Sequence, residues 1–369
     1  MSSLPSPSTS SPPILTRWYI DTRPLTATTA SLPLLSTLQE PDQTTIKAFY
    51  HLSDRHMSLA SYLLKYLFIH RTCRVPWSQI IISRTPAPHK RPCYIPLQQQ
   101  QQQQQQQKLP GEKETSPIPI PNIEFNVSHQ ASLVALAGCI HPTGPTEDDG
   151  DMNLSSQEQQ QPRSPSANNP SIPQIGIDIT CTDDPARRNR GVPKTEAELR
   201  DFIDIFAEVF SQNEIDAMKA YPAAANLDLQ ASIKYRVRLF YTYWALKEAY
   251  IKMTGEALLA PWLRDLEFRD VVIPSPPSSS ASLSSGAWGV PETGVKAVLY
   301  GREVADVRLE VVAFGEDYIF ATAGRGGGFG TSVAVGGNGE LRARWDEFRR
   351  VDIEKDVEPC ARGDCGCLT

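Results

Sequence analysis

The stretch YWALKEAYIK at residues 243–252 decides the interpretation of this chain. It lies within a pattern over residues 232–254 that predicts one long helix. At about 100° per residue, an apolar stripe on this helix faces the core. The stripe consists of Leu239, Tyr243, Leu246, Tyr250 and Met253. Trp244, Glu248 and Lys252 recur every fourth residue on the opposite side.

Glu248 and Lys252 have two interpretations. An exposed pair of this kind contributes only about 0.2–0.5 kcal/mol and is common on solvated helix faces. However, a solvated face has no need of a large aromatic residue such as Trp244. The alternative is that Glu248 acts together with a carboxylate from another element. The pattern alone leaves both interpretations open.

Asp178 is the candidate for that second carboxylate. Three isoleucines alternate with Gly176, Asp178 and Thr180 over residues 175–180, which predicts a strand with Asp178 on the face opposite the isoleucines. Asp178 could instead cap the turn after the strand. If Asp178 and Glu248 meet across a cleft, their oxygens suit Mg²⁺, with waters and substrate phosphates completing the coordination.

The charge distribution points to an anionic ligand. The net charge of −6 argues weakly against general nucleic-acid binding. Between Arg55 and Arg91, however, there is no Asp or Glu. The cationic side chains of this interval are Arg55, Lys65, Arg71, Arg74, Arg84, Lys90 and Arg91. We therefore expect a local site for a polyanion within an acidic protein.

Segments with compositions that cannot form a core divide the chain. They are a Ser/Pro-rich tail at 1–13, a glutamine-rich insertion at 98–118, polar insertions at 141–173 and 274–285, and a flexible tail at 351–369. The remaining halves, 14–140 and 174–350, each combine helices with short strands, which indicates an α+β fold. We expect helices over residues 53–70, 196–210 and 232–254, and strands over residues 17–20, 80–82, 132–137, 175–179, 295–300, 307–313 and 318–323.

Seven scattered cysteines fit reduced thiols better than a disulfide framework. No apolar run reaches the roughly 18 residues that span a bilayer, and the first residues lack the features of a secretory signal. We therefore expect a soluble, cytoplasmic protein without membrane partners. Cys360, Cys365 and Cys367 lack a fourth metal ligand nearby, and the chain end is one residue short of a prenylation box, so neither a metal nor a lipid is predicted there.

Three blocks in this order carry a resemblance to a known family: FNVSHQ at 125–130, IGIDI at 175–179 and WALKEAYIK at 244–252. They resemble the signature blocks of the Sfp-type 4′-phosphopantetheinyl transferases, and most closely the fungal branch and its animal relatives of the aminoadipate pathway. The resemblance covers most of 54–95 and 123–266, and the last block is the specific one. It implies a monomer of two pseudo-symmetric α+β halves that bind coenzyme A between them.

The resemblance also implies an activity and its residues. The 4′-phosphopantetheine arm of coenzyme A would pass to a serine of an acyl or peptidyl carrier protein domain, with release of 3′,5′-ADP. Asp178 and Glu248 would bind Mg²⁺, and Lys252 would contact the phosphate. Glu248, or a water held by the metal, would accept the serine proton. Implied carriers belong to fatty-acid, polyketide and nonribosomal peptide synthases and to the aminoadipate reductase of lysine synthesis.

Further residues follow from the same resemblance. Ser128 and His129 would contact the 3′-phosphate, and Arg84, Lys90, Arg91 and Ser58 match positions that serve the same ligand. Many bacterial relatives have a second acid where this chain has Thr180, so Gln130 or water would complete the metal shell. Taken alone, a histidine such as His129 is more often a structural hydrogen-bonding residue than a catalytic one.

Two alternatives come from other classes of protein. A nucleic-acid-binding protein would account for the basic interval, the glutamine tract and the glycine-rich residues 324–330. Against it, that glycine run contains one arginine, is not repeated and follows a predicted strand, which favours a loop. A catalytically inactive scaffold is the second alternative, and the presence of Asp178, Glu248 and Lys252 argues against it.

Overall fold

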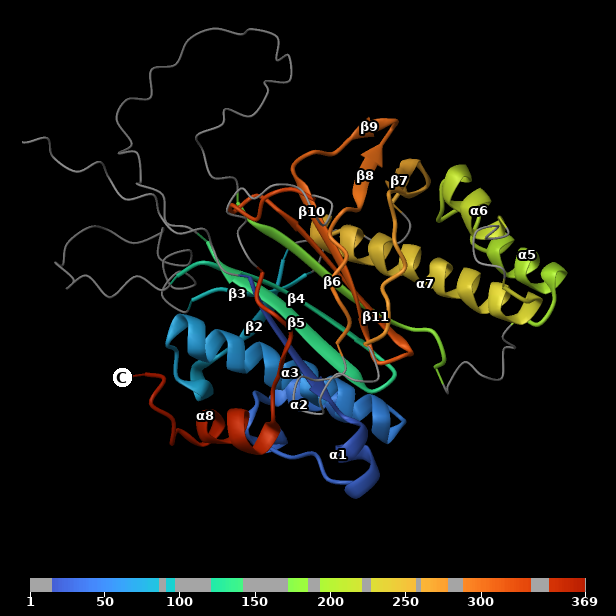
Figure 1. Ribbon diagram of the computed structural model, residues 1–369. Helices are drawn as coiled ribbons and strands as arrows, with labels where there is room; N and C mark the ends of the chain where they lie inside the picture. The colour runs from blue at the N-terminus through green and yellow to red at the C-terminus, as the bar shows by residue number, and fades with distance from the viewer. Residues whose placement is uncertain are drawn as a thin grey trace, which may run out of the picture.

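The computed structural model describes residues 15–85, 91–96, 121–141, 172–184, 193–220, 227–256, 260–277, 288–332 and 345–368. The expected tail at 1–13, the insertion at 98–118 and almost all of the insertion at 141–173 lie outside these residues, as does most of 274–285. The described residues form a mixed α+β architecture, as predicted (Figure 1).

The N-terminal half is a sheet covered by one long helix. Strand β1 (Thr16–Asp21) is followed by two short helices, α1 (Arg23–Thr28) and α2 (Glu40–Lys47), and by the long helix α3 (Leu52–Cys73). A hairpin follows, made of β4 (Ile123–Gln130) and β5 (Leu133–Ile140), and β5 pairs antiparallel with β1. The order is therefore strand, long helix and hairpin.

The C-terminal half repeats this order. Strand β6 (Gln174–Cys181) precedes the long helix α7 (Leu229–Thr254), and a hairpin of β10 (Val307–Phe314) and β11 (Tyr318–Arg325) follows. As in the first half, the second hairpin strand pairs antiparallel with the first strand of the half. The expected pseudo-symmetry is thus present in the strand topology.

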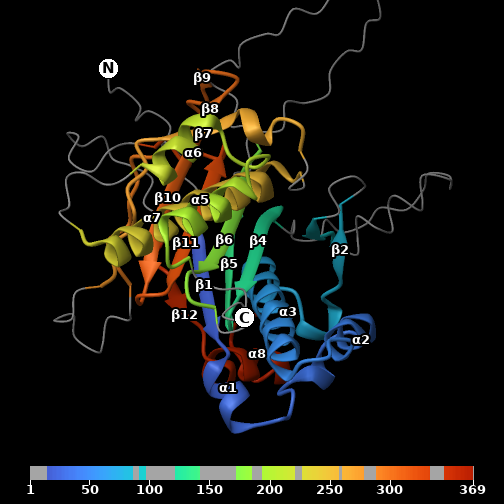
Figure 2. The same ribbon diagram turned by 90° about the vertical axis from the view of Figure 1, so that its right-hand side faces the viewer.

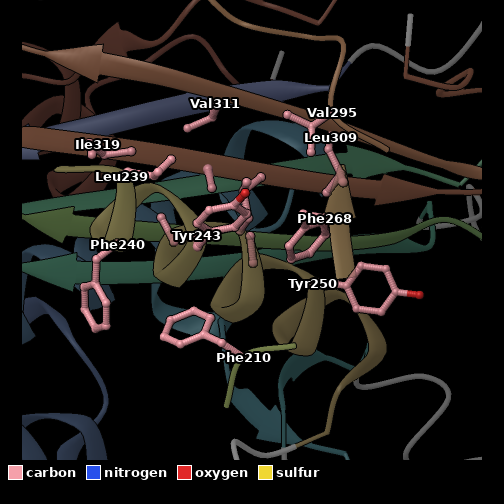
Figure 3. Packing of buried hydrophobic residues seen from close by; sticks show 14 of the residues in the cluster. Phe210, Leu239, Phe240, Tyr243, Tyr250, Phe268, Val295, Leu309, Val311 and Ile319 are labelled. Carbon is pink, nitrogen blue, oxygen red and sulfur yellow. The ribbon is translucent and has the colours of Figure 1, made fainter. Parts of the chain in front are cut away.

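The two sheets pack face to face between the two long helices (Figures 1 and 2). One core cluster joins α3 to the outer face of the first sheet, and a second joins α7 to the outer face of the second sheet (Figure 3). A third cluster lies between the sheets, where Tyr19 and Leu133 meet Ile177 and Phe320. Because strand side chains alternate between faces, the isoleucines of β6 lie in this third cluster while Asp178 lies on the α7 side.

Smaller elements complete the described structure. Helices α5 (Glu196–Asp204) and α6 (Gln212–Lys219) pack beside α7, and the strands β7 (Leu266–Arg269), β8 (Lys296–Leu299) and β9 (Arg302–Glu303) form a separate sheet. The glycine run after β11 is a turn in which Gly326, Gly327 and Gly328 have positive φ angles, so the loop interpretation is confirmed. None of the described helices is long and apolar enough to cross a membrane.

Two local predictions were wrong. The expected helix over 196–210 ends at Asp204, and a second helix begins after Ser211, whose side chain forms a capping box with Glu214. The expected buried strand at 80–82 is also incorrect: a short 3-10 turn is followed by β2 (Ile82–Arg84), which pairs with β3 (Pro92–Tyr94) and is not buried. Apolar runs this short do not report burial by themselves.

The C-terminal segment is the largest correction. Residues 351–369 were expected to form a flexible tail, but strand β12 (Arg349–Arg350) pairs parallel with β1, and a π-helical turn leads into α8 (Glu358–Arg362). Val351, Val357 and Cys360 are buried in the same core cluster as α3. The apolar residues of this segment are too few and too irregularly spaced to show a helical period, so the sequence did not reveal its packing.

Candidate active site

The two halves meet along β4 and β6 through side chains. Three polar residues at alternate positions of β4 each accept a hydrogen bond from a backbone N–H of β6. The pairs are Asn126 Oδ1 with the N–H of Ile177 (3.1 Å), Ser128 Oγ with that of Ile179 (3.2 Å) and Gln130 Oε1 with that of Cys181 (3.3 Å). The block FNVSHQ therefore forms the seam between the halves.

Asp178 lies at the centre of this seam and is only 5% exposed. Its Oδ1 accepts hydrogen bonds from Ser128 Oγ (3.0 Å) and Lys252 Nζ (2.7 Å), and its Oδ2 accepts one from Thr180 Oγ1 (3.0 Å). Asp178 is inside strand β6, so the interpretation as a turn cap is wrong. Three donors fix the orientation of this buried carboxylate and satisfy its oxygens.

Helix α7 brings Lys252 and Glu248 to the seam. Lys252 Nζ also donates to Ser128 Oγ (3.0 Å), so the ammonium group joins all three signature blocks. Helix and strand approach closely because Gly176 has no side chain: a Cβ there would lie 1.9 Å from the carbonyl oxygen of Ala249. Lys252 forms its ion pair with Asp178. Lys252 and Glu248 are therefore not the solvated pair that one interpretation of the helix pattern suggested.

Glu248 has a raised pKa. Desolvation is the largest cause, and the negative charge of Asp178 adds to it, while Lys252 opposes the shift. Two carboxylates from different elements therefore act on each other in a partly buried setting. A divalent cation would relieve this repulsion, and both groups offer the oxygen ligands that Mg²⁺ prefers. Asp178 and Glu248 thus fit a magnesium site in their charge and in their donor chemistry.

Gln130 fits the role of a third Mg²⁺ ligand less well than Asp178 and Glu248 fit theirs. Gln130 Oε1 already accepts from the N–H of Cys181, and Gln130 Nε2 donates to Asp184 Oδ2 at 3.5 Å. An amide oxygen has a second lone pair, so coordination stays chemically open, but the existing bonds orient Gln130 along the seam. Thr180 supplies a hydrogen bond to Asp178 in place of a second acid.

A cationic group lies on the α3 side of the seam. His129 alternates with Ser128 on β4, so it lies on the other face of the strand, toward α3. Although the imidazole reaches solvent, partial desolvation lowers its pKa, and the charges of Lys252 and Lys65 lower it further. Burial lowers the pKa of Lys65 to about 8, with Asp42 opposing the shift and Arg84 adding to it. An anion placed here would restore the charged forms of these groups.

The remaining residues expected to bind coenzyme A differ in their placement. Ser58 is nearly buried on α3, and Arg84 ends β2. Both belong to elements on the α3 side of the seam, beside the cationic group. Lys90 lies outside the described residues, so its expected role is a prediction that the structure does not test.

Arg91 has structural contacts beside the site, and its expected contact with coenzyme A stays a prediction. Its guanidinium pairs with Glu124 and donates to the backbone oxygens of Ile175 (2.9 Å) and Met253 (3.3 Å). Arg91 therefore ties β4, β6 and the C-terminal end of α7 together beside the site. This is a positioning role that its sequence context did not indicate.

Sequence reasoning missed three residues of the site region. Lys65 was seen only as part of the basic interval, although its buried ammonium group acts on His129. Lys247 is fully buried and pairs with Glu214 (2.9 Å), which fastens α7 to α6. Glu214 gave no signal because helix α6 was not predicted. Trp244 packs on the aromatic rings of Phe206 and Phe210, which explains an aromatic residue on that side of α7.

Each half of the chain matches a model of a known protein family. The family model "4′-phosphopantetheinyl transferase, N-terminal" matches residues 26–141, and the model "4′-phosphopantetheinyl transferase superfamily" matches residues 174–321. The chain is 53% identical to 4′-phosphopantetheinyl transferase A of Aspergillus fumigatus, with 96% of both chains covered. It is 51% identical to 4′-phosphopantetheinyl transferase NpgA of Emericella nidulans, with 98% of both covered, and 31% identical to a 4′-phosphopantetheinyl transferase of Aureobasidium melanogenum, with 93% of this chain and 96% of the relative covered.

Proposed function

The chain belongs to the 4′-phosphopantetheinyl transferase superfamily, and from this premise we propose how its seam carries out the transfer. As an enzyme of this family, it moves the 4′-phosphopantetheine arm of coenzyme A to a carrier protein domain. The observation that carries the proposal is the meeting of Asp178, Ser128 and Lys252 between the halves, with Glu248 within electrostatic reach.

Asp178 and Glu248 would hold Mg²⁺ beside the pyrophosphate, with water or Gln130 as a further ligand. The metal would supply positive charge that draws the phosphate oxygens and offsets charge on the leaving group. Lys252 would transfer its hydrogen bonding from Asp178 to the phosphate that leaves with 3′,5′-ADP. Glu248 or an adjacent water would accept the proton of the attacking serine. Little covalent chemistry is required, because positioning and electrostatics dominate phosphoryl transfer.

The cationic group on the α3 side would bind the 3′-phosphate. His129, Lys65 and Arg84 would supply the charge there, and Ser58 would offer a hydroxyl group from α3. The Ser128 hydroxyl lies on the other face of β4, beside Asp178 and Lys252, so any contact of Ser128 with coenzyme A would come from that side. This assignment would place coenzyme A across the seam, with its pyrophosphate at Asp178 and its 3′-phosphate toward α3. Phosphate dianions favour protonated neighbours, in keeping with the depressed pKa values of His129 and Lys65 in the free protein.

Partners and setting are also proposals. Carrier domains of fatty-acid, polyketide and nonribosomal peptide synthases and of aminoadipate reductase are the proposed acceptors, which would link the enzyme to lysine synthesis. We further propose a cytoplasmic monomer that acts on coenzyme A and carriers, with no nucleic-acid or membrane partner. The internal duplication supports the monomer, since both walls of the site come from one chain.

The direct test incubates the protein with coenzyme A, Mg²⁺ and several apo carrier proteins, followed by intact mass spectrometry of each carrier. We expect a mass gain of one phosphopantetheine group and formation of 3′,5′-ADP. No adduct on any carrier would reject the transferase function.

His129 provides a pH-dependent prediction. Its pKa is below the ordinary value of 6.5 in the free protein, so the ring is neutral at neutral pH. A bound 3′-phosphate raises the pKa of His129, so the protein takes up a proton when coenzyme A binds. The affinity for coenzyme A therefore increases as the pH falls through the pKa that His129 has in the complex. We expect the ratio of wild-type to His129→Gln affinity to rise from about pH 8 to about pH 6.

Calorimetric titration of coenzyme A in buffers of different ionisation enthalpy measures this proton uptake. The His129→Gln variant is the matched control, because titration of the phosphate itself cancels in the comparison. Equal proton uptake by both proteins would show that His129 does not contact the phosphate.

A further inference from the structure

Four soft ligand groups converge at the C-terminal end of α3. His70 belongs to the last turn of α3, while Cys360, Cys365 and Cys367 belong to α8 and the residues after it. One ligand atom from each of the four residues lies within 4.8 Å of the other three. His70 precedes Cys365 by 295 residues, which is why a fourth ligand was not found near the cysteines in the sequence. The C-terminal segment lies along the N-terminal half in both views (Figures 1 and 2).

The spacing of these atoms is close to that of a tetrahedral zinc site, with the sulfur pair at the expected edge length and the nitrogen–sulfur pair somewhat shorter than it. With Zn–S bonds of about 2.3 Å and Zn–N bonds of about 2.0–2.1 Å, the tetrahedral edges are about 3.8 Å between sulfurs and about 3.5 Å between sulfur and nitrogen. Cys360 Sγ and Cys367 Sγ are 3.8 Å apart, and His70 Nε2 is 3.1 Å from Cys365 Sγ. All three cysteines are free thiols, and a sulfur separation of 3.8 Å is far longer than a disulfide bond of about 2.05 Å.

The histidine is oriented as a metal ligand requires. His70 Nδ1 is 2.7 Å from the backbone oxygen of Val75. A carbonyl oxygen only accepts, so Nδ1 carries the proton and the lone pair of the neutral ring is on Nε2, which faces Cys365. Metal-binding histidines commonly have this second hydrogen bond to a backbone carbonyl, which fixes the tautomer and the ring plane. His70 is 1% exposed, so rotation of the ring is restricted.

The surroundings suit a closed site with one negative charge. Cys360 is buried, and Cys365 and Cys367 are half-buried at the edge of the α3 core cluster. Three thiolates and one neutral imidazole around Zn²⁺ leave a net charge of −1. The positive charge of Arg71 acts on the Cys360 thiol, and the Arg71 guanidinium donates to the backbone oxygen of Asp356 (2.8 Å), so a positive charge lies near the cluster.

We propose that His70, Cys360, Cys365 and Cys367 form a structural zinc site. Four protein ligands complete a tetrahedron and leave no position for substrate, as in structural Cys₃His sites. On binding, the three thiols release their protons to solvent and the imidazole stays neutral. Thiolate and imidazole ligands select zinc over Mg²⁺, which prefers oxygen ligands, so the site is chemically separate from Asp178 and Glu248.

The site would attach the C-terminal segment to the helix that supports the anion-binding group. Lys65 and Ser58 lie on α3 upstream of His70, and β12 extends the first sheet next to β1. Zinc would join the end of α3 to α8. It would stabilise the C-terminal segment, which is too short to form a large hydrophobic core of its own. Binding free energy of this kind contributes directly to folding stability.

Metal analysis tests the proposal. The full-length protein, purified without chelators, is analysed by plasma mass spectrometry, and we expect about one zinc per chain. Replacement of zinc by Co²⁺ is expected to give thiolate-to-cobalt charge-transfer bands and the absorption of a tetrahedral site. The Cys365→Ser/Cys367→Ser double variant changes the two half-buried ligands, and we expect it to lose the metal and to unfold at a temperature several degrees lower.

Cys93→Ser is the matched control, because Cys93 is a half-buried free thiol on β3. It should keep the full metal content and the cobalt spectrum. Wild-type protein that contains no zinc and takes up no Co²⁺ would overturn the proposal, and so would a disulfide between Cys360 and Cys367 in the native protein. The wild-type measurements decide the matter even if the double variant fails to fold, and they do not depend on transferase activity.

Discussion

Replacement of Glu248 by glutamine is expected to lower the rate of transfer by on the order of 10²–10³-fold, the usual cost of removing one preorganised charge-stabilising group. The substituted amide would keep the size of the side chain, but it would offer one neutral oxygen to the cation and could not accept the serine proton. Steady-state and single-turnover assays of carrier modification measure the loss. Normal turnover by the variant would remove Glu248 from the mechanism.

The same variant should have higher stability when no ligand is present. The folded-state pKa of Glu248 is raised above its ordinary value of 4.5, so ionisation of this group costs stability as the pH rises from the ordinary to the raised pKa. An amide avoids that cost because it does not ionise. We therefore expect the difference in Tm between Glu248→Gln and wild type to be small below that interval and to reach its full size above it.

With Mg²⁺ and coenzyme A present, the wild type should become more stable than Glu248→Gln, because only the wild type has both carboxylates to bind the metal. Glu208→Gln is a suitable control, since its carboxylate is exposed at the surface and pairs only loosely with Arg264 (3.5 Å). It should change neither the activity nor the pH dependence of Tm. A Glu248→Gln variant that is destabilised at neutral pH would contradict the like-charge environment assigned to this residue.

The second large effect is expected for Gly176→Ala. A methyl group at this position would lie 1.9 Å from the carbonyl oxygen of Ala249 and 2.4 Å from the backbone nitrogen of Met253. Neither atom can rotate away, so α7 must shift from β6 and carry Glu248 and Lys252 away from Asp178. We expect a loss of at least about 1–3 kcal/mol in the free energy of unfolding and a large loss of activity.

Gly138→Ala is the matched control in the other half. A Cβ at Gly138 would meet the ring of Phe68 at 2.5 Å, and a side chain can adjust where a helix backbone cannot. We expect a smaller loss of stability and little change in transfer rate. Chemical denaturation and carrier modification assays compare the two variants. Equal effects of both substitutions would contradict the special role of the contact between β6 and α7.

Part of this structure could be predicted from the sequence, because the spacing of apolar residues along a helix or strand indicates which face is buried. The stripe on α7 and the alternation around Asp178 predicted one core face each, and both faces are buried as expected. The partner of Lys252 could not be predicted, because Asp178 and Ser128 come from other elements and contact is a property of the tertiary fold. Lys247 shows the same limit. Its partner Glu214 belongs to helix α6, which begins with a capping box and has no clear apolar pattern in the sequence.

The C-terminal cysteines show the limit of spacing rules. The tail itself offers three soft ligand atoms, and the fourth atom close to them comes from α3, far away in the sequence. Arg91 shows a related limit. Its position in a basic interval predicts a phosphate contact, but it gives no sign of the bonds to Glu124 and to the backbone oxygens of Ile175 and Met253. Charge composition indicates a local field but does not assign the partner of each side chain.

We propose that Asp178 and Glu248 together hold the metal that serves transfer. Titration of Mn²⁺, followed by electron paramagnetic resonance in the presence of coenzyme A, measures this without any carrier protein. We expect about one bound Mn²⁺ per wild-type chain, displaced by excess Mg²⁺, and greatly weakened binding in Asp178→Asn and Glu248→Gln. Equal Mn²⁺ binding by the wild type and both variants would contradict the claim.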